Sequence, residues 1–352
     1  MPRIHLLADY PLKTTGQKLM NATMRPSPIV STIDLESPGV RHGHLKLPHS
    51  HDGSAWGAVM IPITVIVGGT GQTALLSGAN HGDEYEGPVA LLDLARTIKP
   101  EHVAGRIIIV PMMNYPAFLA ATRTSPIDKG NMNRAFPGRP DGTATQKIAD
   151  YFQRVLLPMA DIVLDIHAGG KTLDFVPFAA AHVLDDKSQQ AKCVAAMQAF
   201  NAPYSMMLTE IDNVGMYDSA VEDMGKVFVS TELGGGGSVT AASAMIAKRG
   251  VANLLKHAGI LEGTPETWPT VALDTGPEGC FMTSQSEGLL EMLVDLGDVV
   301  QKGDIIALVH DVRHSGGEPV QYPATISGIL AARHFPGLIA MGDCLAVIAV
   351  AG

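Results

Sequence analysis

The chain has 352 residues, a formal net charge of -10 and 46% hydrophobic residues, so it can bury a large core and is long enough for two domains. The acidic balance argues against a nucleic-acid surface, because phosphate binding needs clustered Lys and Arg. No apolar run reaches the roughly 18 residues of a membrane span, and the three cysteines are far apart and form no CxxC pair. We therefore expect a cytoplasmic protein that binds neither nucleic acid nor membranes.

The first segment of the chain has no marked periodicity. Residues 1–45 begin with a somewhat basic stretch and continue into "RPSPIVSTIDLESPGV", which is punctuated by Pro and Ser. A secretory signal would need a long apolar region followed by a small-residue cleavage site, and this segment has neither. We interpret residues 1–45 as an N-terminal arm and a lead-in to the first domain.

Strand-like apolar runs alternate with stretches of helical spacing between about residues 58 and 260. The strand-like runs are "AVMIPITVIVG", "TALLSG", "GRIIIVPMMN", "DIVLDIHAGG" and "KVFVSTELGG". Helical spacing occurs in "GPVALLDLARTI", "ATQKIADYFQRVLLPMA", "SQQAKCVAAMQAF" and "VTAASAMIAKRGVANLLKHAGI". This alternation predicts an α/β domain with a mainly parallel sheet flanked by helices, which we assign to residues 46–265.

The last part of the chain, residues 266–352, has a different pattern. Short β-type runs are separated by Gly-Asp turns, and "DLGDVV" and "AMGDCL" form a weak internal repeat. No stretch here has convincing helical spacing, so we expect a small all-β domain. Its apolar runs are compatible with a homo-oligomer.

Metal-ligand side chains follow two of the predicted strands. His81 and Glu84, in "GANHGDEYEG", form an H-x-x-E pair whose spacing on a helical turn brings both to one side. His167 ends "DIVLDIH" and would be a third ligand, since the carboxyl ends of parallel strands meet at one edge of the sheet. Asp165 lies on the same strand face as His167 and could orient its imidazole. An isolated H-x-x-E is weak evidence, and a lone strand-end His is more often structural, but the combination favours zinc.

A general base and a carboxylate-binding pair accompany these ligands. Glu232 ends another apolar strand in "VSTELGGGG", where the glycines leave room for a substrate. The alternative is an edge carboxylate before a flexible loop. Asn133 and Arg134, in "GNMNRAFPGR", could hold a substrate carboxylate, with Arg123 upstream. The alternative for this loop is a solvated segment with a structural Arg.

Four motifs taken in order, "HGDE", "NMNRAFPG", "DIHAGG" and "TELGGGG", resemble the succinylglutamate desuccinylase/aspartoacylase family of the zinc carboxypeptidase-like superfamily. The resemblance implies a zinc-carboxypeptidase-like mixed, mainly parallel sheet with an appended β domain. It implies hydrolysis of the amide bond of a small N-acyl amino acid. The implied site residues are one zinc ion on His81, Glu84 and His167, Glu232 as general base and acid, and Asn133 and Arg134 on the substrate α-carboxylate, with Arg123 as a looser match.

Within this family, the stretch from "RPSPIVSTIDLESPGV" into "GANHGDEYEGP" looks like the N-acetyl-L-2,4-diaminobutyrate deacetylases of ectoine breakdown. That subfamily releases acetate and 2,4-diaminobutyrate. Succinylglutamate desuccinylase or aspartoacylase activity would use the same machinery and stays an alternative. A cationic substrate side chain needs an acidic pocket, for which Asp174, Asp212 and Asp218 are candidates, although each also fits an ordinary loop carboxylate.

The predicted β domain raises a second class of function. Its "GDVVQKGDIIALV" resembles the hairpin of biotinyl and lipoyl carrier domains. Such a carrier needs a Lys at a hairpin tip, and "HDVRHSGGEPVQYPATISG" contains none. We therefore expect a structural relative without the cofactor, which covers the cleft and restricts it to small substrates. A non-catalytic metal-binding protein is a third reading, disfavoured because the base and the carboxylate-binding pair accompany the ligands.

Overall fold

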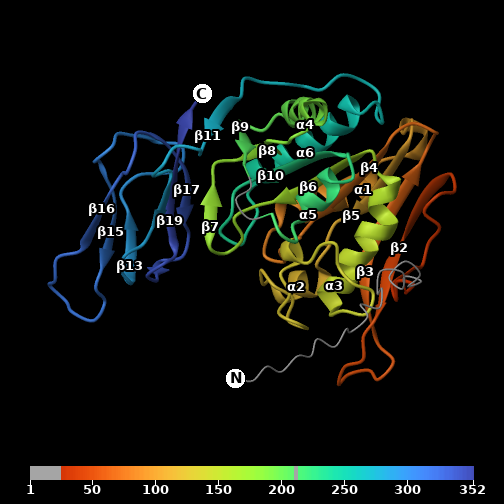
Figure 1. Ribbon diagram of the computed structural model, residues 1–352, viewed down its shortest axis with the longest axis horizontal. Helices are drawn as coiled ribbons and strands as arrows, with labels where there is room; N and C mark the ends of the chain where they lie inside the picture. Colours follow the sequence, from red (N-terminus) through yellow and green to blue (C-terminus); the bar gives the residue numbers. More distant parts are fainter. Residues whose placement is uncertain (1–24, 210–212) are drawn as a thin grey trace, which may run out of the picture.

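The computed structural model describes residues 25–209 and 213–352, and its centre is a large twisted sheet (Figure 1). The main sheet has 15 strands in the described residues, and two of them lie off its main path. In spatial order that path is β1 (Val30–Ser31), β2 (Gly39–Pro48), β3 (Ala58–Val67), β5 (Arg106–Val110), β4 (Thr73–Gly78), β6 (Ile162–His167), β10 (Val227–Glu232), β8 (Phe178–His182), β9 (Tyr204–Leu208), β11 (Val271–Asp274), β19 (Cys344–Ala351), β17 (Gly328–His334) and β14 (Val299–Val300).

The centre of this sheet is parallel. Strands β5, β4, β6 and β10 run in one direction, and the antiparallel strands β3 and β8 lie on either side of them. The four strands are almost wholly apolar because both of their faces are covered, as the sequence pattern indicated. The predicted mixed α/β fold with a mostly parallel centre is confirmed.

Helices cover both faces of the parallel strands. They are α1 (Glu86–Thr97), α2 (Tyr115–Ala120), α3 (Ala144–Tyr151), α4 (Lys187–Phe200), α5 (Tyr217–Glu222) and α6 (Ala241–His257), with short turns η1 (Pro100–His102), η2 (Met132–Arg134), η3 (Phe152–Leu156) and η4 (Leu157–Met159). Successive strand residues face opposite sides, so Leu76 of β4 packs in the cluster of α1, α4 and α6, and Leu75 in the cluster of α3 and α5. None of the helices in the described ranges is long and apolar enough to cross a bilayer.

Two regions differ from the sequence interpretation. Strand β2 begins at Gly39, inside the expected lead-in, and pairs with β3 along its whole length, burying Leu45 and Leu47. Residues 39–45 therefore belong to the sheet, which corrects that part of the interpretation. Strands β8 and β9 have no clear sequence signal, because β8 reads "FAAAH" and alanine has low β propensity. Residues 1–24 of the predicted arm lie outside the described residues.

The elements described between residues 271 and 351 are all strands. Beyond β11, β14, β17 and β19 they comprise β12 (Phe281–Thr283), which pairs with β19, and a second sheet of β16 (Val320–Pro323), β15 (Ile305–His310), β13 (Gly288–Met292) and β18 (Leu338–Ile339). These strands lie to one side of the helices, yet the main sheet runs into them, because β11 pairs with β9 (Figure 1). Strand β7 (Leu173–Phe175) also leaves the α/β part to pair with β17.

Candidate active site

The predicted site residues meet at the carboxyl ends of the parallel strands. His81 and Glu84 lie in the turn after β4, and His167 and Glu232 are the last residues of β6 and β10. His167 and Glu232 are direct partners in the register of these two strands. The expected convergence at one edge of the sheet is therefore present, because neighbouring parallel strands end at the same level.

The turn after β4 holds its two ligand-type side chains through close backbone packing. Gly82 passes so near to α2 that a Cβ there would lie 2.0 Å from the carbonyl carbon of Ala117. The Gly82 amide also donates a hydrogen bond of 3.0 Å to the Thr122 carbonyl oxygen. Only glycine fits this position, so the packing against α2 fixes the flanking His81 and Glu84.

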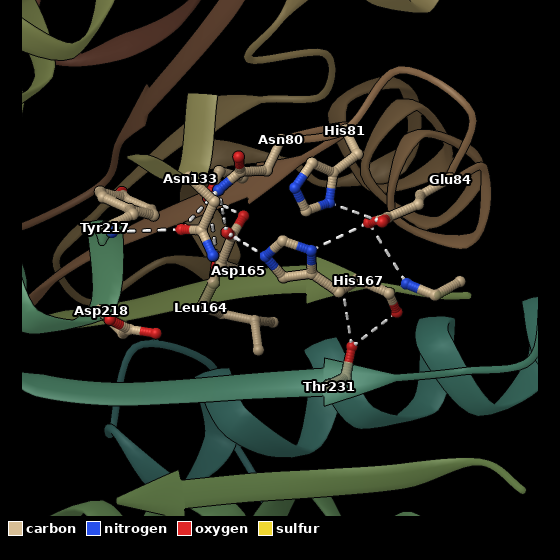
Figure 2. A network of polar contacts seen from close by, with 12 residues as sticks. Asn80, His81, Glu84, Asn133, Leu164, Asp165, His167, Tyr217, Asp218 and Thr231 are labelled. Atoms are coloured by element: carbon tan, nitrogen blue, oxygen red, sulfur yellow. Dashed lines mark hydrogen bonds and ion pairs between the residues drawn. The ribbon is translucent and has the colours of Figure 1, made fainter. Parts of the chain in front are cut away.

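His81, Glu84 and His167 bring three donor atoms together. Nδ1 of His81 lies 2.7 Å from one carboxylate oxygen of Glu84, and Nδ1 of His167 lies 2.9 Å from the other (Figure 2). One donor atom from each residue lies within 4.8 Å of the others, and all three residues are buried. Imidazole nitrogens and a carboxylate oxygen are the donors that zinc accepts, so this set fits a divalent metal with open positions for water or substrate.

Asp165 fixes the imidazole of His167 from behind. Its Oδ2 lies 2.7 Å from Nε2 of His167 and accepts a 2.8 Å hydrogen bond from the Asn80 amide (Figure 2). The other carboxylate oxygen accepts a 2.7 Å hydrogen bond from the Ser77 hydroxyl. A carboxylate at Nε2 keeps a proton on that nitrogen and directs the Nδ1 lone pair toward a cation. The sequence indicated Asp165 for this position but not Asn80 or Ser77, whose only signal is that they lie next to the turn.

The metal-ligand candidates shift one another's pKa values. Burial acts to raise the pKa of Glu84, but the facing charges of His81 and His167 outweigh it and hold the pKa well below its usual range. Burial acts to lower the pKa of His167, but Asp165 and Glu84 raise it well above its ordinary value. Protonated imidazole thus balances the buried carboxylates, and a bound cation would take over that role and release a proton.

Glu232 has the properties of a proton-transfer group. Burial, followed by the nearby charge of Glu84, raises its pKa to about 8, although His167 and Arg123 act in the opposite direction. Its Oε2 is buried and has no hydrogen-bond partner among the described residues. The glycine run after it is required by backbone shape: Gly236 has a φ of 68°, and a Cβ there would lie 2.5 Å from the ring of Phe335. The base candidate is therefore held next to the C-terminal strands.

The carboxylate-binding candidates lie on η2 and the loop before it. Oδ1 of Asn133 accepts hydrogen bonds from the Tyr217 amide at 3.1 Å and from Asn80 at 3.4 Å, which leaves its amide nitrogen as the donor for a ligand (Figure 2). The guanidinium of Arg123 is half-exposed and lies 3.7 Å from Glu84. A cavity of about 230 Å³ is lined by the predicted residues His81, Arg123, Asn133, Arg134, His167 and Glu232.

The three aspartates considered as binding residues for a cationic substrate side chain differ in whether they line this cavity. Asp174 lies on β7, forms an ion pair of 3.6 Å with Arg333 and does not line this cavity. Asp212 lies outside the described residues. Asp218 is buried and lines the cavity together with His182, a residue that the sequence reading missed because it ends the unrecognised strand β8.

The mixed sheet and the His–Glu–His donor set at its carboxyl edge define the class: an enzyme of mixed α/β fold with one candidate metal site. Residues 70–258 match the family described as "Succinylglutamate desuccinylase/Aspartoacylase catalytic domain". The chain belongs to the succinylglutamate desuccinylase/aspartoacylase family and is an amidohydrolase that acts on N-acyl amino acids.

Similar proteins match this chain over nearly its whole length. The chain is 56% identical over 328 residues to the N-alpha-acetyl-L-2,4-diaminobutyric acid deacetylase of Halomonas elongata, a match that covers 92% of this chain and 96% of that protein. The crystal structure of a succinylglutamate desuccinylase from Silicibacter sp. TM1040 matches with a TM-score of 0.92 and 63% identity over 94% of this chain and 100% of that one. The product-bound ectoine utilization protein EutE (DoeB) of Ruegeria pomeroyi matches with a TM-score of 0.91 and 62% identity, covering 93% of this chain and 100% of that one.

Proposed function

We propose that this enzyme deacetylates N-acetyl-L-2,4-diaminobutyrate and releases acetate and 2,4-diaminobutyrate. The observation that carries the reaction class is a cavity of about 230 Å³ that brings Glu232 together with the metal-ligand candidates His81 and His167 and with the carboxylate-binding candidates. The similarity to the Halomonas elongata deacetylase over nearly the full length of both chains supports the substrate. Desuccinylase activity is the second candidate, because one solved relative carries that name.

One zinc ion per chain is part of this proposal, with His81, Glu84 and His167 as its ligands. Support comes from the three buried donor atoms that converge and from Asp165, which directs His167 toward them. When bound, the ion would polarise the amide carbonyl and lower the pKa of a water molecule.

The protein's own side chains supply the remaining chemistry. Glu232 accepts a proton from water as general base and donates it to the leaving amine as general acid. The amide of Asn133 and the guanidinium of Arg134 bind the α-carboxylate and orient the substrate. Arg123 lies at the same cavity, where its positive charge favours the negative charge that develops on the amide oxygen.

We propose the domain limits that the sequence indicates for the catalytic domain, 46–265, and for a β domain related to biotinyl and lipoyl carriers, 266–352. Of the N-terminal segment 1–45, residues 39–45 join the catalytic sheet as part of β2. The proposed role of the β domain is to cover the active-site cleft. The packing of Phe335 on the glycine loop after Glu232, and the pairing of β7 with β17, support this role. Unchanged small-substrate kinetics in a folded protein without residues 270–352 would contradict it.

The binding partners and the cellular location of the protein are also part of the proposal. The substrate is a small molecule, and the apolar β domain is compatible with self-association into a homo-oligomer. All three cysteines are free thiols, which fits a cytoplasmic location.

The test is a product assay with metal analysis on one preparation. N-acetyl-L-2,4-diaminobutyrate, N-acetylaspartate and N-succinylglutamate are offered side by side, with Glu232→Gln as the inactive control. We expect one zinc per chain, a preference for the first substrate, and a loss of kcat in the variant of about 10²- to 10⁴-fold with zinc retained. Preference for another substrate would overturn the substrate assignment, and absence of both zinc and hydrolysis would overturn the reaction.

A further inference from the structure

The active-site cavity contains one carboxylate that the proposed reaction leaves without a role. In the described part of the chain, Asp165, Asp218 and Glu232 are the acidic residues that line it. Asp165 is committed to His167, Asn80 and Ser77, and Glu232 is the proposed base. Asp218 has no role in the proposed reaction, so its place in the cavity lining calls for another explanation.

Asp218 is tied to the carboxylate-binding residues through its neighbour in the chain. It is the second residue of α5, and the preceding Tyr217 donates its backbone amide to Oδ1 of Asn133 at 3.1 Å. This contact fixes the start of α5 next to Asn133, the proposed ligand of the α-carboxylate (Figure 2). The position of Asp218 relative to Asn133 is therefore set by backbone structure, and the side chain is buried.

Asp218 belongs to a group of polar side chains at one wall of the cavity. Its Oδ1 accepts hydrogen bonds from the backbone amide and the hydroxyl of Ser219, at 2.5 and 3.2 Å. Its Oδ2 lies 3.9 Å from Nε2 of His182, whose Nδ1 lies 2.8 Å from Glu222. Two carboxylates, those of Asp218 and Glu222, therefore face the single imidazole of His182.

The same cavity has apolar walls and unpaired polar atoms. Phe228 lines it, with its ring stacked on His182 at a centroid distance of 6.0 Å, and Leu208 and Met216 lie on the wall as well. Nε2 of the buried His81 has no hydrogen-bond partner among the described residues. An apolar enclosure strengthens the attraction between a buried carboxylate and a cation.

We infer that Asp218, positioned by His182 and Glu222, binds the side-chain ammonium of the substrate and selects N-acyl diamino acids. This inference rests on the proposed function, because an N-acyl-2,4-diaminobutyrate carries an α-carboxylate and a γ-ammonium that must both be accommodated. Asn133 and Arg134 bind the first group, and Asp218 binds the second. A substrate with a second carboxylate, such as N-acetylaspartate or N-succinylglutamate, would face the charge of Asp218 and be rejected.

The test compares N-acetyl-L-2,4-diaminobutyrate with N-acetyl-L-norvaline, in which a methyl group replaces the ammonium. The wild-type enzyme is expected to prefer the charged substrate by about 10- to 100-fold in kcat/KM, the range for losing a charged hydrogen bond. Asp218→Asn is expected to remove most of this preference by lowering kcat/KM for the charged substrate, with less than about a threefold change for the norvaline compound. Asp174→Asn, at the ion pair with Arg333 outside the cavity, is the matched control and should keep the preference.

The outcomes separate the two proposals. Equal losses for both substrates in a folded, zinc-loaded Asp218→Asn enzyme would mean a structural role and overturn the inference, while the deacetylase assignment stands. If the wild-type enzyme does not distinguish the two substrates, the inference about Asp218 is overturned without any variant. This result decides the question even when Asp218→Asn fails to fold. A wild-type enzyme that cleaves neither compound would overturn the proposed function itself.

Discussion

Nε2 of His167 lies 2.7 Å from Oδ2 of Asp165, two residues earlier on the same face of β6. The aspartate also accepts hydrogen bonds from Asn80 and Ser77, so both of its oxygens are engaged. This arrangement makes the strand itself, rather than a loop, the support of the candidate metal ligand. A ligand held on a rigid strand keeps its orientation when the cavity is empty.

The variant Asp165→Asn should weaken zinc binding by about 10- to 100-fold, the range found for residues that support metal ligands. An amide has only one acceptor oxygen, so it cannot satisfy His167, Asn80 and Ser77 together. Competition with a chromophoric chelator measures the affinity, and excess zinc should restore hydrolysis. Asp161→Asn, just before the opposite end of the same strand, is the control. Unchanged zinc affinity in Asp165→Asn would contradict the supporting role.

Metal removal should lower the thermal stability of the protein. Without a cation, the buried Glu84 faces the imidazoles of His81 and His167 and the half-exposed guanidinium of Arg123. Saturating zinc at about 1,000 times its Kd adds about 4 kcal/mol to the free energy of unfolding. Scanning calorimetry with and without chelator should show a lower Tm for the metal-free form. The double variant His81→Ala/His167→Ala is the control, and its Tm should not respond to zinc. An equal response in this variant would place the metal elsewhere.

Asp128 should anchor the substrate-binding loop to α3. Its carboxylate accepts hydrogen bonds from the backbone amide and hydroxyl of Thr145, at 2.7 and 2.8 Å, and from the Gly130 amide at 3.0 Å. The loop continues into Asn133 and Arg134. We expect Asp128→Asn to raise KM with little change in kcat and to reduce stability by about 1 kcal/mol, a modest value because the site is partly exposed to solvent. Steady-state kinetics and urea unfolding measure the two effects.

This anchor also predicts a pH dependence. Burial acts to raise the pKa of Asp128, but the hydrogen-bonding groups of Thr145, Thr143 and Gly130 outweigh it and lower the pKa below its ordinary value of 3.8. A lowered pKa in the folded protein means that ionised Asp128 stabilises the fold. This stabilisation is complete above the pKa of the unfolded protein, and it is lost as pH falls through the pKa of the folded protein. The stability difference between wild type and Asp128→Asn should therefore shrink from about pH 6 to about pH 3. A constant difference over this range would show that ionisation of Asp128 contributes nothing.

Gly250 should be required by the packing of α6 on α4. A Cβ at this position would lie 2.2 Å from the ring of Phe200, which is buried. Gly250→Ala gains about 1 kcal/mol of helix propensity, but overpacking costs about 1–3 kcal/mol, so we expect net destabilisation in urea unfolding. Met245→Ala, on the exposed side of the same helix, should change stability by less than about 0.5 kcal/mol. A stabilised Gly250→Ala protein would contradict the packing argument.

The sequence determined the parallel centre of the sheet and the residues that could bind a metal. Strands β4, β6 and β10 are local apolar runs, and polar side chains lie at or just after the end of each, so both features can be identified without knowing the fold. The hydrophobic pattern also identified α1, α4 and α6. Their alternation with strands is enough to place His81, His167 and Glu232 at one edge.

The tertiary structure decided which neighbours these residues have. Three aspartates were equal candidates for a cationic side chain, and only the fold places Asp218 in the cavity while pairing Asp174 with Arg333. Strand β8, which brings His182 to Asp218, consists largely of alanine and leaves no periodic signal. Local periodicity reports which face of an element is buried. It does not report which distant strand pairs beside it, because that depends on packing between segments far apart in the chain.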